Sequence, residues 1–184
     1  DRALNELLVA DGGMSADDAR ECAALAQDSG QGLDRLLVSK GYMTEPEMLK
    51  IMGRYLAYPY EGDLRDRDVP KAFVDRVPVH FARSHNVVAL EQINGTMKVA
   101  TCAPFDVHPL DDVATMVATE VDVVLSPKAE ITSPINQAYK TKADVVDEAL
   151  DNLDEGDLVS LSEAVDEHED ILDVANKAPI IKLL

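Results

Sequence analysis

The side chains that could do chemistry are few and scattered along the chain. Cys102, Asp106 and His108 stand within seven residues of one another, and thiolate, carboxylate and imidazole are all zinc ligands. Their spacing matches no standard zinc motif, and Pro104 and Pro109 indicate that they lie on a loop. Asp106 and His108 could also form an acid–base pair, but no nucleophile elbow or oxyanion loop accompanies them. We therefore predict no metal ligand and no catalytic residue.

The other candidates have simpler structural explanations. His80 and His85 flank a short helix–strand junction without a partner cysteine, so we interpret them as surface histidines. Cys22 stands among alanines and a leucine at helical spacing, which predicts a small core residue. No glycine begins a G-x-x-x-x-G-K-[ST] phosphate loop, and Gly95 and Lys98 fit a hairpin turn and an exposed strand residue. We predict that this chain holds no cofactor and hydrolyses no ATP.

The charge of the chain excludes one class of partner. Its 184 residues carry a net charge of −18, whereas nucleic-acid binding needs a basic face. Between residues 143 and 173 there are 13 acids and no base, which leaves 22 of the 35 acids against 17 bases elsewhere. This acidic run lacks EF-hand spacing around Gly156, so a solvated tether is the simpler interpretation than a calcium site.

The cysteine count and the hydropathy of the sequence predict the compartment in which the chain folds. Two cysteines are too few for a disulfide framework and favour a reducing cytoplasm. No apolar run approaches membrane-spanning length and no signal peptide is visible, so we expect no direct membrane insertion.

The amino-terminal part of the chain contains a duplicated stretch. Residues 4–15 return as residues 33–44, offset by 29 positions. The identical pairs are Leu4/Leu33, Leu7/Leu36, Leu8/Leu37, Val9/Val38, Gly12/Gly41 and Met14/Met43. Each copy predicts a short helix with one apolar stripe, followed by a glycine in the left-handed conformation.

A second helix start follows each glycine. Thr44 with Glu47 three residues later forms a capping box, and Pro46 suits the first helical turn. The first copy has Ser15 and Asp18 in the same places. Two helical hairpins therefore predict a four-helix unit over residues 1–57.

In residues 58–141 the spacing of apolar residues changes, so that short helical patterns are followed by the alternating pattern of strands. We predict short helices over 68–74 and 78–83, strands over 87–90, 96–101 and 121–125, and helices over 110–118 and 129–140. Asn94 and Gly95 form a hairpin turn between the first two strands. The fold class is thus α+β: a four-helix unit, a small three-stranded, mostly antiparallel sheet packed with helices, and an acidic linker.

Residues 142–184 are assigned from their composition, which is first acidic and then apolar. Residues 142–176 form the acidic linker, whose first part can extend the preceding helix. Residues 177–184 are apolar and look like the start of a further domain. Because the chain begins without methionine and stops inside this apolar run, we expect a fragment of a longer protein.

Five short motifs occur in an order that resembles a known family. They are LAYPY at 56–60, Val77-Pro78 with Phe81-Ala82-Arg83, the V-A-x-x-x-P-x-D pattern at 99–106, the I-x-x-x-Y pattern at 135–139, and NKAPIIKLL at 176–184. Together with the duplicated hairpin, this order resembles the amino-terminal domain of bacterial type II secretion and type IV pilus assembly ATPases. The acidic linker and the final motif look most like the type II secretion ATPase, with the pilus ATPase as the close alternative.

The resemblance implies a function for the fragment. It would be a non-catalytic docking and regulatory domain that binds the cytoplasmic domain of an inner-membrane platform protein. The missing part would be a hexameric ATPase that binds ATP and Mg and through which the chain self-associates. The protein would then be cytoplasmic and peripheral at the inner membrane through its partner. A small stand-alone enzyme ranks last among the alternative functions, because no set of catalytic residues in the sequence supports it.

Some relatives bind cyclic-di-GMP through two copies of a motif that begins R-L-G. Here the two triplets are Ala3-Leu4-Asn5 and Gly32-Leu33-Asp34. The motif's final glutamine falls on Ala26 in the first copy and on Tyr55 in the second. The scaffold leucines persist while the polar groups do not, so a cyclic-di-GMP-sensing module of a pilus ATPase is the alternative function.

Overall fold

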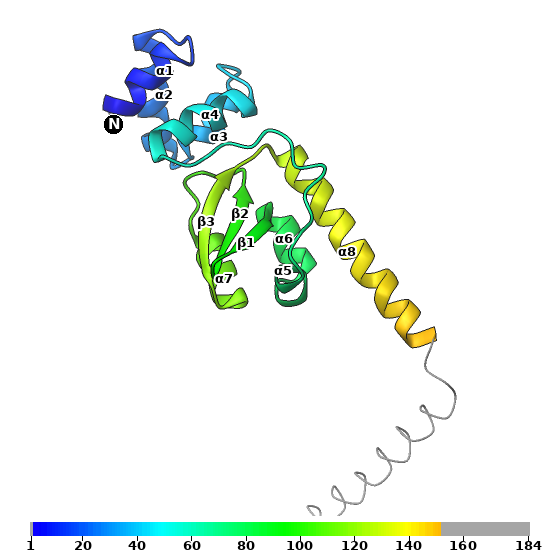
Figure 1. Ribbon diagram of the computed structural model, residues 1–184. Coiled ribbons are helices and arrows are strands. Elements are labelled where there is room, and N and C mark those ends of the chain that lie inside the picture. Colours follow the sequence, from blue (N-terminus) through cyan, green and yellow to red (C-terminus); the bar gives the residue numbers. More distant parts are fainter. Residues whose placement is uncertain (1, 152–184) are drawn as a thin grey trace, which may run out of the picture. The chain divides into compact units, whose positions relative to one another are not determined.

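The computed structural model describes residues 2–151, and four helices form its amino-terminal part (Figure 1). They are α1 (Arg2–Ala10), α2 (Ala16–Ser29), α3 (Leu33–Ser39) and α4 (Glu45–Leu56). Both α1 and α3 pack against α2 and α4, which confirms the four-helix unit. Its buried side chains, which we name the helical core, are Leu4, Leu8, Met14, Ala19, Cys22, Leu36, Leu37, Met43, Met48, Leu49, Ile51, Met52 and Leu125.

The predicted helix starts are present in both copies. The Thr44 backbone N–H donates to the Glu47 carboxylate at 2.8 Å, and the Thr44 side chain completes the capping box. That backbone hydrogen bond is the main reason why the pKa of Glu47 lies below its usual value. In the first copy the Ser15 hydroxyl accepts from the Asp18 N–H at 3.1 Å.

The paired glycines differ in their roles, which corrects one prediction. Gly41 has φ +76° and ends its helix in the left-handed conformation. In the first copy the left-handed residue is Gly13, not Gly12. A Cβ at Gly12 would lie 2.5 Å from the Leu8 carbonyl oxygen, so Gly12 is required by close packing rather than by its backbone angles.

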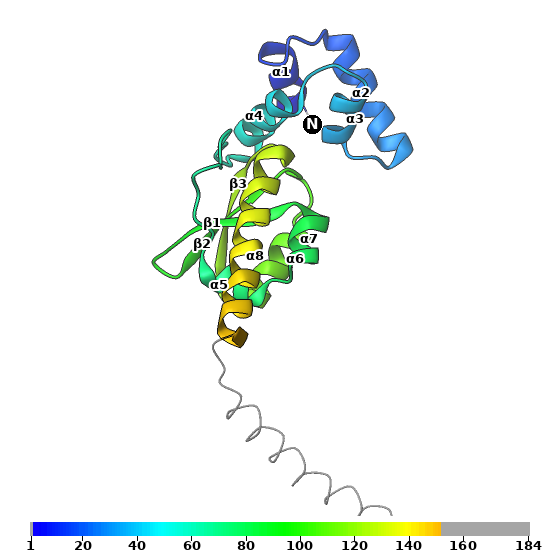
Figure 2. The ribbon, with the colours of Figure 1, turned by 90° about the vertical axis from the view of Figure 1, so that its right-hand side faces the viewer.

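Four helices and three strands follow. The helices are α5 (Lys71–Arg76), α6 (Val79–His85), α7 (His108–Val117) and α8 (Lys128–Asp151). The strands are β1 (Val87–Ile93), β2 (Thr96–Thr101) and β3 (Glu120–Leu125). The helices gather on one side of the sheet in both views (Figures 1 and 2) and supply its core with Phe73, Val77, Val113, Ile131 and Ile135. The α+β class is confirmed.

The sheet is mixed rather than mostly antiparallel. Its order is β1-β2-β3, in which β1 and β2 are antiparallel and β2 and β3 are parallel. Asn94 and Gly95, both with positive φ, make the predicted tight turn. The parallel pair arises because α7 carries the chain back across the sheet before β3 begins, and parallel neighbours need such a crossover.

Some boundaries differ from the predicted ones. Pro70 precedes α5 rather than lying inside it, while Pro109 lies in the first turn of α7 rather than on a loop. A proline fits there because the first helical N–H groups have no intrahelical partner. Helix α8 continues past residue 140 to Asp151. The rest of the acidic linker and residues 177–184 lie outside the described residues.

Leu125 connects the two parts of the fold. It is the last residue of β3, yet its side chain is fully buried in the helical core. Its backbone pairs with the segment after α4, because Leu125 N–H donates to Pro59 O at 2.8 Å and Glu61 N–H donates to Leu125 O at 2.9 Å. Leu125 thus links the sheet to the helical core.

Replacing Leu125 with alanine is expected to lower the free energy of unfolding by about 2–5 kcal/mol, because a fully buried leucine leaves a cavity when it is truncated. Urea unfolding of the whole chain measures this loss. The control is Val9→Ala, at a side chain that is 38% exposed, which should change stability by less than about 0.5 kcal/mol. Equal losses in the two variants would contradict the anchoring role.

Candidate docking groove

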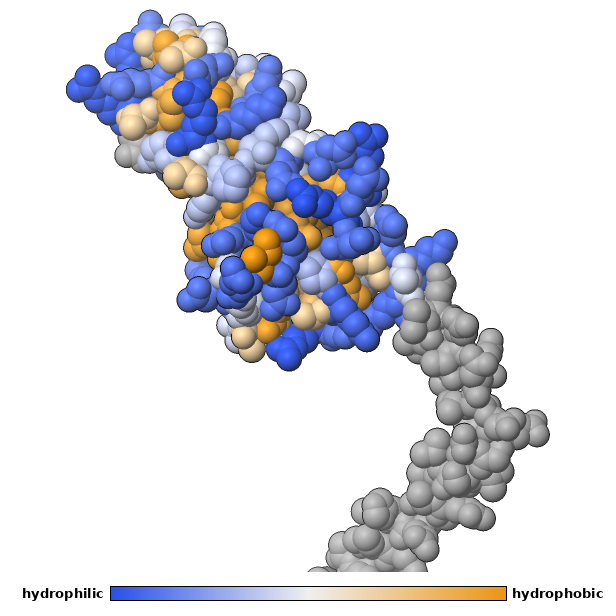
Figure 3. Space-filling view, in the orientation of Figure 1, coloured by the Kyte–Doolittle hydropathy of each residue, from blue (hydrophilic) through white to orange (hydrophobic). Residues whose placement is uncertain are grey.

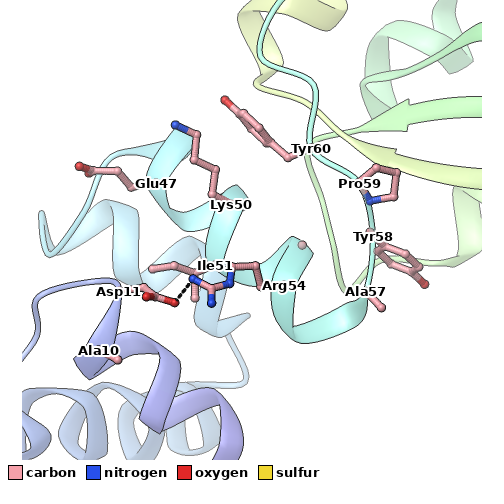
Figure 4. Close-up of a pocket in the computed structure, with 11 residues that line it drawn as sticks. Ala10, Asp11, Glu47, Lys50, Ile51, Arg54, Ala57, Tyr58, Pro59 and Tyr60 are labelled. Carbon is pink, nitrogen blue, oxygen red and sulfur yellow. Dashed lines mark hydrogen bonds and ion pairs between the residues drawn. The ribbon is translucent and has the colours of Figure 1, made fainter.

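An open groove of about 900 Å³ lies beside helix α4 (Figure 4). One wall is α4 with the end of α1, and the other is the segment that leaves α4. Its lining residues are Ala10, Asp11, Glu47, Lys50, Ile51, Gly53, Arg54, Ala57, Tyr58, Pro59 and Tyr60. The site therefore joins the end of the duplicated hairpins to the LAYPY motif.

The α4 wall presents two cations one helical turn apart. Lys50 and Arg54 stand four residues apart on α4, and both are exposed. The Arg54 guanidinium forms an ion pair with the Asp11 carboxylate at the end of α1, 2.5 Å between Nη1 and Oδ2 (Figure 4). This pair orients Arg54 and connects the two helices, although exposed ion pairs add little stability.

A tight turn shapes the opposite wall. Ala57 ends α4 in the left-handed conformation, with φ 57° and ψ 33°, and Tyr58 N–H donates to Gly53 O at 2.8 Å. A Cβ at Gly53 would lie 2.7 Å from the Tyr58 carbonyl oxygen. The glycine is therefore what allows residues 57–60 to fold back beside the helix.

Tyr60 stands opposite Lys50 across the groove (Figure 4). The Lys50 Nζ lies 5.4 Å from the centre of the Tyr60 ring, within the range of a cation–π contact. Burial raises the pKa of Tyr60, and the carboxylates of Glu130 and Glu45 raise it further. The phenol is therefore neutral at physiological pH and offers a hydroxyl and an aromatic face to a ligand.

This arrangement suits binding rather than bond breaking. The groove combines apolar and aromatic surface with two exposed cations and two carboxylates, a mixture that is typical of protein interfaces. It contains no nucleophile paired with a base. A segment of a partner protein with apolar side chains and carboxylates matches its chemistry.

The candidates for a metal or acid–base site are only partly brought together. Cys102 and Asp106 line a second pocket of about 560 Å³ with His85, whereas His108 does not line it. Burial raises the pKa of Cys102 to about 11, with a contribution from Glu45, so the thiol is protonated and a poor ligand. Among residues 2–151 no group of three His, Cys, Asp or Glu side chains has a metal-binding arrangement.

The remaining candidate residues from the sequence have structural roles rather than a place in a site. His80 is exposed, and His85 packs its ring on Phe81 with 4.5 Å between ring centres. Cys22 is buried in the helical core, as predicted. Lys98 is half-buried rather than exposed, because it pairs with Glu91 on the neighbouring strand.

The sequence did not single out the groove residues Asp11, Lys50, Gly53 and Arg54. One signal was present: Gly53 stands inside a strong helical pattern, four residues before the break at Ala57. A glycine at such a place indicates a close approach of another backbone segment.

Apolar side chains also reach the surface outside the groove. Figure 3 shows orange surface among the charged residues on both parts of the fold. The exposed large apolar residues are Val9, Leu25 and Tyr42 in the helical part, and Ile93, Phe105 and Val107 in the sheet part. No helix in the described part of the chain combines the length and apolar character of a membrane span.

Comparison with protein families finds a matching domain model. Residues 56–145 match the model of the MshEN domain. The match begins at the last residue of α4 and includes the whole sheet part. This match supports the predicted resemblance to the amino-terminal domain of type II secretion and type IV pilus assembly ATPases.

A curated relative spans the whole chain. The chain is 23% identical over 181 residues to the type IV pilus assembly ATPase PilB of Myxococcus xanthus, covering 98% of this chain and 32% of that protein. The chain thus spans about a third of the length of this relative.

Solved structures share the fold. A structure of MshE with cyclic-di-GMP matches with a TM-score of 0.59 at 21% identity, covering 74% of this chain and 98% of that chain. Two crystal forms of the amino-terminal domain of XpsE match at 20% identity. Their TM-scores are 0.50 and 0.59, with coverage of 71% and 75% of this chain and 90% and 94% of those chains.

Proposed function

We propose that this chain is a non-catalytic docking and regulatory domain that binds the cytoplasmic domain of an inner-membrane platform protein. The observation that carries the proposal is the open groove beside α4, with Lys50 and Arg54 on one wall and Tyr60 on the other. Its size and mixed chemistry suit a segment of a protein. Acidic side chains of the partner would reach the two cations, and apolar ones would cover the tyrosine.

The rest of the protein follows from the same proposal. A further domain would bind ATP and Mg, assemble as a hexamer and supply the motor, while this chain connects it to the membrane complex. We place the protein in type II secretion, with type IV pilus assembly as the alternative. The identity of the platform protein that binds the chain distinguishes the two systems.

Reversing both cations of the groove tests the proposal. In the variant Lys50→Glu with Arg54→Glu, binding to the platform domain is expected to weaken by about tenfold or more, because each charged hydrogen bond contributes about 1.5–3 kcal/mol. Calorimetric titration measures the dissociation constant.

The matched control reverses two cations outside the groove, Arg20 on α2 and Lys71 on α5. Both are exposed, and Arg20, like Arg54, is ion-paired with an aspartate, although its partner Asp17 lies in its own helix. This variant has the same change in net charge and should bind like the parent chain. Equal weakening in both variants would show that overall charge, not the groove, governs binding.

Cyclic-di-GMP sensing is the second candidate, because one structural neighbour is the structure of MshE with this ligand. In this chain the positions of the motif's first arginine are Ala3 and Gly32, both exposed. Asp34 replaces the motif's glycine with a carboxylate. The scaffold of such a site is present without its cations, so docking is the function that the residues support better.

A further inference from the structure

The outer edge of β3 carries backbone groups without partners. Leu125 directs its N–H and C=O away from β2, toward Pro59 and Glu61. Successive residues of a strand direct these groups alternately to its two sides, so Val123 and Val121 direct theirs to the same outer side as Leu125. No hydrogen bond within residues 2–151 occupies those outer groups.

The chain itself begins to cover this edge and then stops. The segment at Tyr60 pairs with Leu125 as a parallel strand over a single bridge. The next step of such a ladder would need the N–H of Pro59 to donate to the Val123 carbonyl, and proline has no N–H. The left-handed Ala57 then turns the chain away. The edge accepts a strand at one end and is open beyond it.

The side chains along the open edge are acidic. Glu120 and Asp122 are exposed and share one face of β3, which carries no base. Lys98, which lies opposite Asp122 on the neighbouring strand, is paired with Glu91. A second copy of this chain would bring its own Glu120 and Asp122 to the same face, and like charges across paired strands are destabilising. The charge therefore favours a basic segment over self-pairing.

We propose that the free edge of β3 is a docking site for an extended segment of another protein, which adds as a further strand and carries lysine or arginine at alternate positions. Main-chain hydrogen bonds to Val121 and Val123 provide attachment, and Glu120 and Asp122 select the basic side chains. This inference rests on the sheet edge alone and holds whether or not the groove beside α4 is the platform site.

Hydrogen exchange in the full chain tests strand addition. The probe is a capped ten-residue peptide that alternates lysine and valine, and its counterpart alternates glutamate and valine. The lysine peptide is expected to slow exchange of the Val121 and Val123 amides, followed by NMR, while the glutamate peptide leaves both unchanged. Unchanged exchange at both valines with the lysine peptide would overturn the proposal.

Two variants separate strand addition from general attraction to an acidic protein. Glu120→Lys with Asp122→Lys is expected to weaken binding of the lysine peptide at least about tenfold. Val123→Pro removes one outward donor without touching the groups that face β2, and should also weaken binding. The control, Asp111→Lys with Asp112→Lys on α7, makes the same change in net charge at exposed positions and should keep parental affinity.

The comparison of the two charge variants decides the outcome even if the proline variant does not fold. Selective loss in the β3 variant supports the site. Equal loss in the α7 control would mean non-specific attraction and would overturn it. Because the assay uses a peptide and not the platform domain, its failure leaves the groove proposal standing, and failure of platform binding leaves the edge proposal standing.

Discussion

Titration of cyclic-di-GMP into this chain is expected to show no binding at micromolar concentrations. The ligand carries two phosphates and two guanines, so a binder needs cations or oriented N–H donors together with close backbone approach. The motif of the family's binders supplies arginine and glycine at its start in each of two copies. In this chain neither residue occupies its motif position in either copy.

The first copy contains an arginine next to the motif position, but it is engaged elsewhere. Ala3 is exposed and uncharged, and its neighbour Arg2 forms an exposed ion pair with Glu6, 2.9 Å between Nε and Oε1. A shift of one residue on a helix turns a side chain by about 100°. Arg2 therefore projects from another side of α1 and does not replace the missing cation.

The second copy is blocked by a carboxylate. Asp34 is only 6% exposed, and a Cβ at Gly32 would lie 2.4 Å from its Oδ1 atom. The space that any side chain at position 32 would enter is thus partly filled by Asp34. The two departures from the motif in this copy are structurally linked, and they place a negative charge where an anionic ligand would bind.

The expected loss is large. A charged hydrogen bond contributes about 1.5–3 kcal/mol, and its absence from two copies corresponds to roughly two to four orders of magnitude in affinity. The MshE domain in the same calorimetric assay is the positive control. A dissociation constant in the micromolar range or tighter for this chain would refute the prediction and favour the sensing function.

Much of the helical part could be predicted because its signals are local. The capping box at Thr44 and Glu47, the helix end at Gly41 and the buried leucines all depend on residues within one or two helical turns. The tight turn at Asn94 and Gly95 is local in the same sense. These features were confirmed.

The features that the sequence did not indicate depend on contacts between distant residues. The parallel pairing of β3 depends on the side of β2 to which the chain returns after α7. The alternation of apolar and polar residues within a strand does not determine that side. The burial of Leu125 among the helices also depends on residues that are far from it in the sequence. The groove combines residues 10–11, 47–54 and 57–60, and none of these stretches forms a motif alone.

If the proposed docking function is right, residues 1–140 are sufficient to bind the platform protein. Residues 1–140 form one compact unit that contains the groove and both hydrophobic cores. Within the described residues 2–151, all residues that line the groove belong to this unit. We therefore expect the isolated unit to bind the platform domain as tightly as the whole chain does.

The most direct measurement is the dissociation constant of the platform domain for the whole chain and for residues 1–140, at low salt and at about 0.3 M salt. Surface electrostatics are strongly screened at the higher ionic strength, whereas contacts made inside a groove persist. We expect the dissociation constants of the two chains to agree within a factor of about three at both salt concentrations. Binding that disappears with the acidic segment, or that vanishes at the higher salt, would contradict this expectation.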